Sequence, residues 1–414
     1  MIQAGDTAFI LVSAALVLLM TPGLALFYGG MVRGKNVLGT FMQSFFLIAL
    51  ITFEWVILGY SMSFGPDVSG LTGNLAWAWL SGVGAAPNPD YAATIPHSLF
   101  MIYQCMFAVI TPALITGAFA ERVRFAPFLV FSLLWAVLVY NPVCHWVWGA
   151  GGWLKLMGVV DFAGGIVVHL TCGAAALAAV FVIGPRKDYG RRQFFPHNLP
   201  MTLMGTGLLW FGWFGFNGGS ALAADGVAAS AFVATHLGGM AGMAMWTIVE
   251  WWHRGKPTTL GAASGAVAGL ATITPAAGFV TAPSAMVIGL IAGGACYLGV
   301  LAKARLGYDD SLDVVGIHGL GGLIGTLMAG LLATKGVNAA GVDGLFYGNP
   351  AQFGIQALGV GVVLVYALVL SWALLKLVDK TMGLRMSPEA ESLGMDQAEH
   401  TESGYSDSLD IGSR

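Results

Sequence analysis

Apolar stretches near twenty residues in length recur along the whole chain, and no other feature constrains its fold so strongly. A helix needs about 20 apolar residues to cross the hydrocarbon core of a bilayer. Of the 414 residues, 57% are hydrophobic and only 9% are charged, whereas soluble domains carry about 25% charged residues. The apolar runs also lack the turn-rich alternation of a membrane β-barrel. We therefore expect an all-α integral membrane protein in contact with the lipid bilayer.

Eleven of these runs are long enough to be transmembrane helices. We expect them at about 6–29, 38–62, 97–119, 126–145, 162–184, 199–221, 227–250, 259–279, 284–304, 314–334 and 352–376. The first run has no basic segment before it and no small-residue cleavage site after it. We therefore interpret it as a membrane helix and not as a removed signal peptide.

The basic residues give these helices an orientation. With the N-terminus outside, 16 of the 18 Lys and Arg residues fall on the cytoplasmic side, and only Lys155 and Lys335 fall outside. Cytoplasmic loops of membrane proteins are enriched in Lys and Arg. The sequence therefore predicts an N-out, C-in topology.

Short similarities relate two halves of the chain, at about 6–185 and 199–334. Corresponding segments lie five helices apart, as with LFYGG (26–30) and GFNGG (215–219), or ITPAL (110–114) and ITPAA (273–277). Because five is odd, the matching helices run in opposite directions through the membrane. We predict an inverted repeat of helices 1–5 and 6–10, with helix 11 (352–376) added.

An acidic residue stands eight positions before a histidine at the start of two apolar helices, Asp161 before His169 and Asp310 before His318. Ionisable groups inside a membrane are costly and mark functional sites. For either histidine alone, a structural role as a hydrogen-bond partner between helices is about as common as a functional one. The inverted repeat, however, would bring His169 and His318 together near the midplane, where two neutral imidazoles could share a hydrogen bond and relay a proton.

The two acids have two candidate roles. A carboxylate at a helix start commonly caps the first N–H groups, and Asp161 stands just before Gly164 and Gly165. Direct binding of a cation is the alternative, and we favour the cap by about two to one because caps are the commoner use of Asp at a helix start. Asp310 should mirror Asp161 at the inner end.

Aromatic residues gather toward the predicted outer ends of the helices. Trp148 follows helix four, Tyr103 and Phe107 share helix three, and Phe216 lies in helix six. Aromatic faces attract small cations, and Ser220, one turn beyond Phe216, could add a hydroxyl acceptor. Tryptophans at such depths more often anchor a protein at the membrane interface, so both interpretations stay open.

Composition argues against several other classes of protein. A net charge of −3 with no long basic run gives no sign of a nucleic-acid partner. The four cysteines occur singly, without CxxC or CxxCH spacing, which argues against disulfides, a metal site or c-type haem, so we expect no cofactor. After residues 1–385, which we treat as one transmembrane domain, residues 386–414 contain seven acids and one arginine and are predicted to be a cytoplasmic tail.

Four segments resemble the ammonium transporter/Rhesus family, and most closely its bacterial ammonium transporters. They are DFAGGIVVHLTCGAAALAA (161–179), LLWFGWFGFNGGSAL (208–222), KPTTLGAASGAVAGLATITPA (256–276) and DDSLDVVGIHGLGG (309–322). The resemblance extends from the first helix to the tail. It implies a homotrimer in a bacterial cytoplasmic (inner) membrane, with one pore in each eleven-helix subunit.

The resemblance also implies roles for individual residues. The outer ammonium-recruitment site would be formed by Trp148, Phe107 and Ser220, with Tyr103 where the family often has phenylalanine. The stacked phenyl gate would be Phe107 and Phe216, the twin histidines His169 and His318, and the essential acid Asp161. Gln104 and Thr274 align with polar positions near the pore.

We expect a transporter and not an enzyme. Ammonium, or methylammonium, would gather outside, lose its proton behind the phenyl gate and cross as ammonia past the histidines, with the proton following so that transport is electrogenic. By the same resemblance, a PII-type signal protein would dock on the cytoplasmic face, and SLGMD (392–396) would belong to a regulatory C-terminus. The alternatives are an ammonium sensor with little flux and a membrane oxidoreductase with haem on the histidines, which would absorb visible light.

Overall fold

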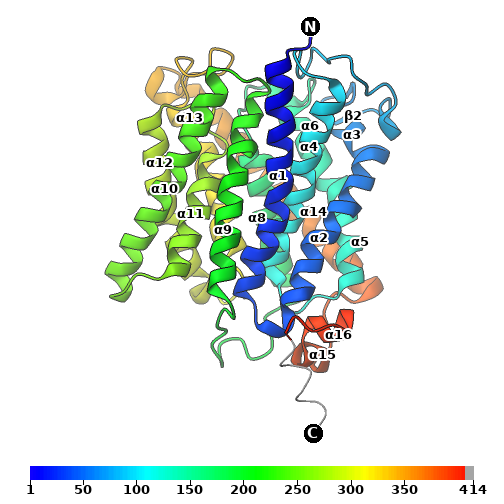
Figure 1. Ribbon diagram of the computed structural model, residues 1–414, viewed down its shortest axis with the longest axis vertical. Helices are drawn as coiled ribbons and strands as arrows, with labels where there is room; N and C mark the ends of the chain where they lie inside the picture. The colour runs from blue at the N-terminus through cyan, green and yellow to red at the C-terminus, as the bar shows by residue number, and fades with distance from the viewer. Residues whose placement is uncertain (406–414) are drawn as a thin grey trace.

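The computed structural model describes residues 1–405, which form a bundle of long helices (Figure 1). The main helices are α1 (Ala4–Met31), α2 (Val37–Glu54), α3 (Tyr60–Phe64), α4 (His97–Ile115), α5 (Phe125–Trp135), α6 (Asn141–Trp148), α8 (Thr171–Ile183), α9 (Leu199–Trp213), α10 (Gly226–Arg254), α11 (Thr259–Ile273), α12 (Ala282–Leu306), α13 (Leu320–Leu332) and α14 (Pro350–Met382). Shorter elements are the helices α7 (Trp153–Leu156), α15 (Pro388–Leu393) and α16 (Met395–His400), and the 3₁₀ turns η1 (Gly34–Asn36), η3 (Ala78–Leu80), η4 (Thr116–Phe119), η8 (Gly219–Ala221) and η10 (Leu345–Tyr347). Strands β1 (Asp67–Val68) and β2 (Thr72–Gly73) pair antiparallel, with Asp67 opposite Gly73.

Within residues 1–405, nine helical segments are long and apolar enough to cross a membrane. They are Ala4–Met31, Gly34–Phe64, His97–Phe119, Phe125–Leu156, Gly165–Ile183, Gly226–Arg254, Ala282–Leu306, Val315–Leu332 and Pro350–Met382. The expected spans at 199–221 and 259–279 correspond to α9 with its continuation and to the shorter α11. The count of eleven therefore stays a prediction.

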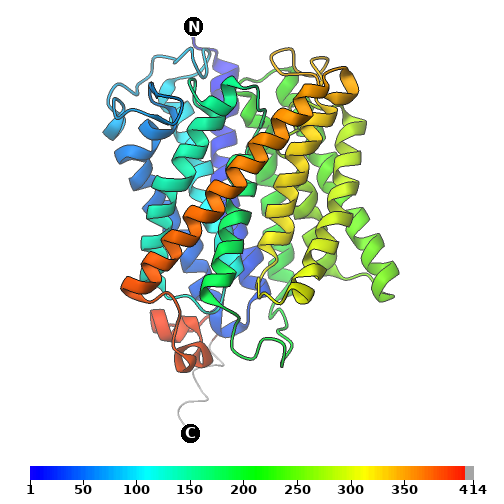
Figure 2. The same cartoon turned by 180° about the vertical axis from the view of Figure 1, so that it is seen from behind.

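The helices pack in two groups joined across the middle of the bundle. Helix α1 packs against α2, α4 and α9, while α10, α11 and α12 pack on one another. Helix α14 crosses the back of the bundle diagonally and contacts α5, α8 and α13 (Figure 2). Residue 1 and the short helices α15 and α16 lie at opposite ends of the bundle (Figure 1). We call the end that carries residue 1 the N-terminal face and the end that carries α15 and α16 the C-terminal face.

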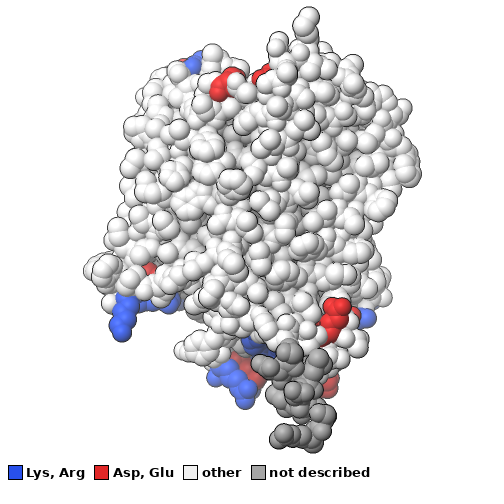
Figure 3. Space-filling view, in the orientation of Figure 1, with Lys and Arg blue, Asp and Glu red and all other residues white. Residues whose placement is uncertain are grey.

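Charged side chains are confined to these two faces on the side shown in Figure 3, with a wide uncharged band between them. Burying an unpaired charge in hydrocarbon costs several kcal/mol, so an uncharged band of this kind is typical of a membrane-embedded surface. The distribution agrees with the apolar character of the nine helical segments.

Among residues 1–405, five π-helical turns interrupt the helices. They are η2 (Trp55–Gly59), η5 (Ala136–Tyr140), η6 (Gly165–Leu170), η7 (Phe214–Gly218) and η9 (Val315–Gly319). A π turn inserts one extra residue and re-aims the side chains around it, and such turns are frequent at functional sites. Three of them contain the predicted site residues His169, Phe216 and His318.

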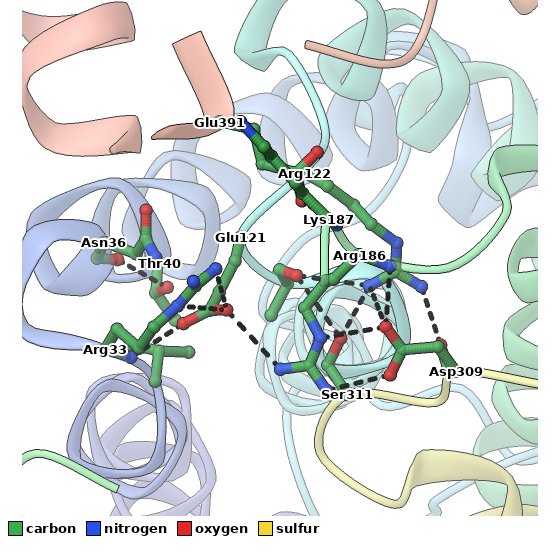
Figure 4. Close-up of polar contacts among 12 residues, drawn as sticks. Arg33, Asn36, Thr40, Glu121, Arg122, Arg186, Lys187, Asp309, Ser311 and Glu391 are labelled. Atoms are coloured by element: carbon green, nitrogen blue, oxygen red, sulfur yellow. Dashed lines mark hydrogen bonds and ion pairs between the residues drawn. The ribbon is translucent and has the colours of Figure 1, made fainter. Parts of the chain in front are cut away.

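A set of charged residues, all buried except the half-buried Arg33, joins loops from both halves of the chain at the C-terminal face (Figure 4). We call it the lower ion-pair cluster; its members are Arg33, Glu121, Arg122, Arg186 and Asp309. Asp309 accepts hydrogen bonds from Arg186 Nε at 2.9 Å and Nη2 at 2.8 Å, and Glu121 pairs with Arg33 at 2.7 Å and with Arg186 at 3.4 Å. Arg122 is fully buried and donates to the carbonyl of Asp309 at 2.7 Å. The cluster thus ties the segments after α1, α4, α8 and α12 together.

The hydrogen bonds in this cluster outweigh the cost of burying its two acids. Burial alone would raise the pKa of Asp309, but hydrogen bonds and charge from Arg186 hold that pKa below its ordinary value of 3.8. Arg33 and Arg186 likewise hold the pKa of Glu121 below 4.5 against the effect of burial. Both groups therefore stabilise the fold in their ionised form.

The segment after α14 folds back onto the C-terminal face. Lys35 Nζ donates to the carbonyl of Glu391 at 2.9 Å, Met395 N donates to Asn36 Oδ1 at 2.8 Å, and Asp396 accepts a hydrogen bond from Gly39 N at 2.8 Å. Tyr405 OH also bonds His197 Nε2 at 2.7 Å, so the described part of the predicted tail, 386–414, contacts the bundle up to residue 405, and its positions 406–414 lie outside the described residues.

Replacing Asp309 by Asn tests the cluster. Removing one partner of a buried ion pair costs about 3–5 kcal/mol, so thermal unfolding in detergent should shift to a clearly lower temperature. The stabilisation is present above pH 3.8, the ordinary pKa of Asp, and disappears as the pH falls through the lower folded pKa. The difference between wild type and Asp309→Asn should therefore persist at neutral pH and shrink in acid.

Asp313→Asn is the matched control, because Asp313 lies in the same loop, pairs with Lys303 at a partly exposed position and has a positive φ that Asn tolerates. It should cost about 1 kcal/mol or less. Equal losses in the two variants would contradict a special role for the buried cluster.

Candidate functional site

The two predicted histidines meet inside the bundle although 149 residues separate them. His169 Nδ1 and His318 Nδ1 are 3.2 Å apart, and the rings are nearly parallel, with centroids 5.2 Å apart and planes at 21°. Both side chains are almost fully buried. His169 Nε2 has no hydrogen-bond partner among residues 1–405. One imidazole can donate the shared proton and the other accept it, which leaves the outer nitrogens available to a neighbour.

Glycines allow the two histidine helices to approach this closely. A Cβ on Gly173 would collide with the backbone of Gly319, and one on Gly322 would collide with Gly165 O and with the side chain of His169. Small residues at helix crossings are the usual means of close packing in membrane proteins. These contacts, together with the π turns η6 and η9, determine the position of the imidazole pair.

A narrow cavity of about 10 Å³, roughly the space needed for one water molecule, adjoins the imidazole pair. We call it the histidine cavity. Apart from the two histidines its walls are apolar or aromatic: Met20, Leu24, Ile110, Leu114, Val168, Leu209, Trp213, Phe216 and Val267. A bare cation would lose its hydration there with few groups to replace it.

Two stacked phenyl rings separate the histidine cavity from a wider one. Phe107 and Phe216 have centroids 4.2 Å apart with planes at 33°; Phe216 lines the histidine cavity and Phe107 lines the other. Tyr103 fixes this arrangement from behind, since its hydroxyl donates to the carbonyls of Gly215 and Phe216 at 3.0 and 2.9 Å. The structure therefore places Tyr103 outside the cavity wall, where it positions the phenyl pair instead of facing a solute.

The wider cavity, which we call the upper cavity, has a volume of about 570 Å³ and lies among the loops of the N-terminal face. Of the predicted recruitment residues, Trp148, Phe107 and Ser220 line it, and so does Gln104. The Trp148 and Phe107 rings meet edge to face at 6.0 Å and 88°. Ring faces and a hydroxyl oxygen at one cavity wall are suited to a small cation.

Asp161 also borders the upper cavity, but its carboxylate is directed at the backbone. Oδ1 accepts from the N–H groups of Gly164 and Gly165 at 2.8 and 2.6 Å, and Oδ2 accepts from Ile166 and Val167 at 2.7 and 3.1 Å. Gly164 has a φ of +116°, which favours glycine and lets the chain turn into η6. Burial raises the pKa of Asp161, and the four N–H bonds oppose that rise. The geometry is that of a helix cap.

Asp310 occupies the corresponding position before η9 with far fewer partners. Its Oδ2 accepts from Val315 N at 2.8 Å, and Oδ1 has no hydrogen-bond partner among residues 1–405. Lys303 donates instead to the backbone carbonyl of Asp310 at 2.8 Å and pairs with Asp313. Burial raises the pKa of Asp310 to about 6. The two acids are matched in sequence spacing but unequal in hydrogen bonding.

The positions of Thr274 and Trp213 relative to the histidine cavity could not be predicted from the sequence. Thr274 does not line either cavity; it donates to Leu270 O at 2.8 Å and accepts from Trp213 Nε1 at 2.9 Å. Trp213 in turn stacks on His169, with centroids 5.6 Å apart and planes at 26°. Trp213 is thus a wall of the histidine cavity that Thr274 holds in place. In the sequence it is one aromatic residue in an apolar run and carried no signal.

The fold and the site define a polytopic helical membrane protein with a histidine-lined cavity closed off by an aromatic pair. Comparison with known proteins gives the family. The model described as Ammonium Transporter Family matches residues 8–405. An ammonium transporter of Bacillus subtilis (strain 168) is 53% identical over 408 residues, which covers 98% of this chain and 100% of that protein. The chain therefore belongs to the ammonium transporter family, as the sequence segments predicted.

Solved structures agree with this assignment. The crystal structure of Saccharomyces cerevisiae Mep2 matches with a TM-score of 0.88 and 36% identity, over 93% of this chain and 91% of that chain. A structure described as a sensor Amt protein matches with a TM-score of 0.88 and 29% identity, over 96% and 98% of the two chains. The chain thus has the multi-pass membrane fold of this family.

Replacing Asp161 by Asn tests the cap. The amide keeps one acceptor oxygen but points a donor at two of the four N–H groups, so we expect a loss of about 2–4 kcal/mol in unfolding free energy. Hydrogen exchange of the amides at 164–167 should also become faster. Asp225→Asn is the control, because Asp225 caps α10 with two N–H groups at an exposed position, where Asn and water can replace the carboxylate. Comparable losses in both variants would rule out the special importance of the Asp161 cap.

Proposed function

We propose that this chain conducts ammonium across a bacterial cytoplasmic membrane through a pore in each subunit. The proposal is supported by one observation above all, the imidazole pair in an apolar cavity behind the Phe107–Phe216 pair. The eleven-helix count, the inverted repeat and an outer N-terminal face belong to the same proposal. The orientation is supported by the 16 of 18 basic residues that it assigns to the cytoplasmic side.

Ammonium first binds in the upper cavity. The faces of Trp148 and Phe107 attract the cation, and Ser220 supplies an acceptor oxygen. Cation–π attraction is worth about 0.5–2 kcal/mol, which concentrates ammonium without holding it. The Asp161 carboxylate contributes through the geometry of η6, because backbone N–H groups occupy both of its oxygens.

The phenyl pair and the histidine cavity then favour the neutral form. An ammonium ion entering an apolar space of about 10 Å³ would lose its hydration at a cost of several kcal/mol, whereas ammonia loses little. Ammonium therefore gives up its proton and crosses as ammonia. The proton enters the imidazole pair at one ring and leaves from the other through the Nδ1···Nδ1 contact, so one positive charge crosses with each ammonia and transport is electrogenic.

Partners on the C-terminal face complete the proposal. Family resemblance supports a homotrimer, a PII-type signal protein as regulator, and a regulatory role for the segment from residue 386 onward. The packing of Glu391 and Asp396 against the loop after α1 supports that last role, since a contact of this kind joins the segment directly to the transmembrane domain, 1–385.

Histidine variants test the mechanism. His169→Asn and His318→Asn keep polar side chains but cannot relay a proton, so the ammonium-evoked current through purified protein in a planar membrane should fall at least tenfold. His236→Asn is the control, because His236 lies on the exposed surface of α10, next to Trp210 and Phe214. Saturable ammonium uptake by wild-type proteoliposomes without any current would refute the electrogenic mechanism.

An ammonium sensor is the second candidate, because the structure described as a sensor Amt protein shares the fold. The same proteoliposomes discriminate between the two functions. A transporter shows saturable flux that the His169→Asn change alters, whereas a sensor binds ammonium but shows neither saturable nor variant-sensitive flux. The second result would replace the proposed function.

A further inference from the structure

The upper cavity contains a primary ammonium group that belongs to the protein. Lys155, in the short helix α7, lines the cavity together with Trp148 and Tyr91. Its Nζ donates to the backbone carbonyl of Trp148 at 3.1 Å and lies 5.8 Å from the centre of the Tyr91 ring. Contact with an aromatic face and a bond to an oxygen acceptor are the same interactions that a free ammonium ion would make in this cavity.

The Tyr91 ring is a rigid partner for this cation. Its hydroxyl donates to Phe64 O at 2.7 Å and accepts from Ala150 N at 3.1 Å, and the ring stacks on Phe100 with centroids 5.0 Å apart. Because the ring is fixed at both its edge and its face, a cation that contacts it does not pay the entropy of ordering the ring.

The charge of Lys155 is not neutralised by a close ion pair. Among residues 1–405, no carboxylate lies within 4.0 Å of its Nζ, whereas Lys303 is paired with Asp313 on the other face. Two other acids, Asp90 and Asp225, line the same cavity at a greater distance. A free cation entering the cavity therefore meets the like charge of Lys155 while the acids attract both.

We propose that Lys155 is a tethered competitor of the substrate, which lowers the occupancy of the upper cavity by ammonium and so sets the apparent affinity of transport. The inference rests on the proposed function and adds a residue that determines affinity. It is specific to one lysine. Of the two basic residues predicted to lie outside, Lys155 lines the upper cavity, whereas Lys335 lines a separate pocket with Asp343 and Tyr347.

The size of the effect follows from Coulomb's law. One like charge roughly 5–10 Å away in a water-filled cavity changes the binding constant of a monovalent cation about two- to fourfold. Salt screens this interaction, since the Debye length falls from about 10 Å at 0.1 M to about 3 Å at 1 M. An electrostatic competitor must therefore lose its influence in high salt.

The experiment measures the ammonium concentration that gives half-maximal current in proteoliposomes containing the full chain. Lys155→Gln and Lys155→Met should lower that concentration about two- to fourfold at low ionic strength, and the gain should disappear near 1 M of an inert salt. Lys155→Arg, which keeps the charge and a donor for the Trp148 carbonyl, should resemble wild type. Lys335→Gln, the matched control, should leave the concentration unchanged.

Other outcomes overturn the proposal. If Lys155→Gln and Lys155→Met raise the half-maximal concentration, the lysine positions Trp148 for binding and does not compete. If they match Lys335→Gln, the lysine has no influence on the cavity. A wild-type protein without saturable ammonium-evoked current or flux would instead defeat the proposed function, so the two failures are distinguishable.

Discussion

Four hydrogen bonds to the carboxylate of Asp161 allow a helix to begin inside the bundle, and the rest of the site depends on that start. The first N–H groups of any helix lack partners within the helix, and leaving them unpaired in apolar surroundings costs several kcal/mol each. Asp161 satisfies those of Gly164 through Val167 at once. From this fixed origin the π turn η6 directs His169 toward its partner, so the cap defines the imidazole geometry without contacting either ring.

The corresponding end of the second histidine helix is built differently. Asp310 has one hydrogen bond to a backbone N–H and an oxygen without a partner among the described residues. With its pKa raised to about 6, it is ionised at neutral pH at some cost to stability and takes up a proton in mild acid. The two acids, each eight residues before a histidine, thus match in sequence spacing but differ in their hydrogen-bonding environment.

Most features that depend on the length of apolar runs and on the spacing of polar residues were predicted from the sequence. Helix positions followed from apolar length, and the meeting of His169 and His318 followed from two matched segments. Features that depend on three-dimensional packing have no recognisable pattern in the sequence. Tyr103 supports the phenyl pair from behind instead of lining the cavity, and Arg122 is buried among carbonyls of loops far apart in sequence. A basic residue after a helix reads as an orientation signal, and nothing local distinguishes the buried one from its exposed neighbours.

The proposed function requires that the upper cavity recruit ammonium only weakly. Conduction requires a solute to bind well enough to enter and loosely enough to leave, and a free carboxylate would hold ammonium too long. Asp161, which lines the same cavity as Trp148 and Ser220, has both oxygens committed to backbone N–H groups, so in the proposed mechanism ring faces and a hydroxyl bind the cation at this wall. The proposed role of Lys155 acts in the same direction, because its ammonium contacts an aromatic face and a carbonyl in that cavity. In the proposed mechanism, the affinity for ammonium is therefore limited by the cap, which occupies the Asp161 carboxylate, and by the competing ammonium of Lys155.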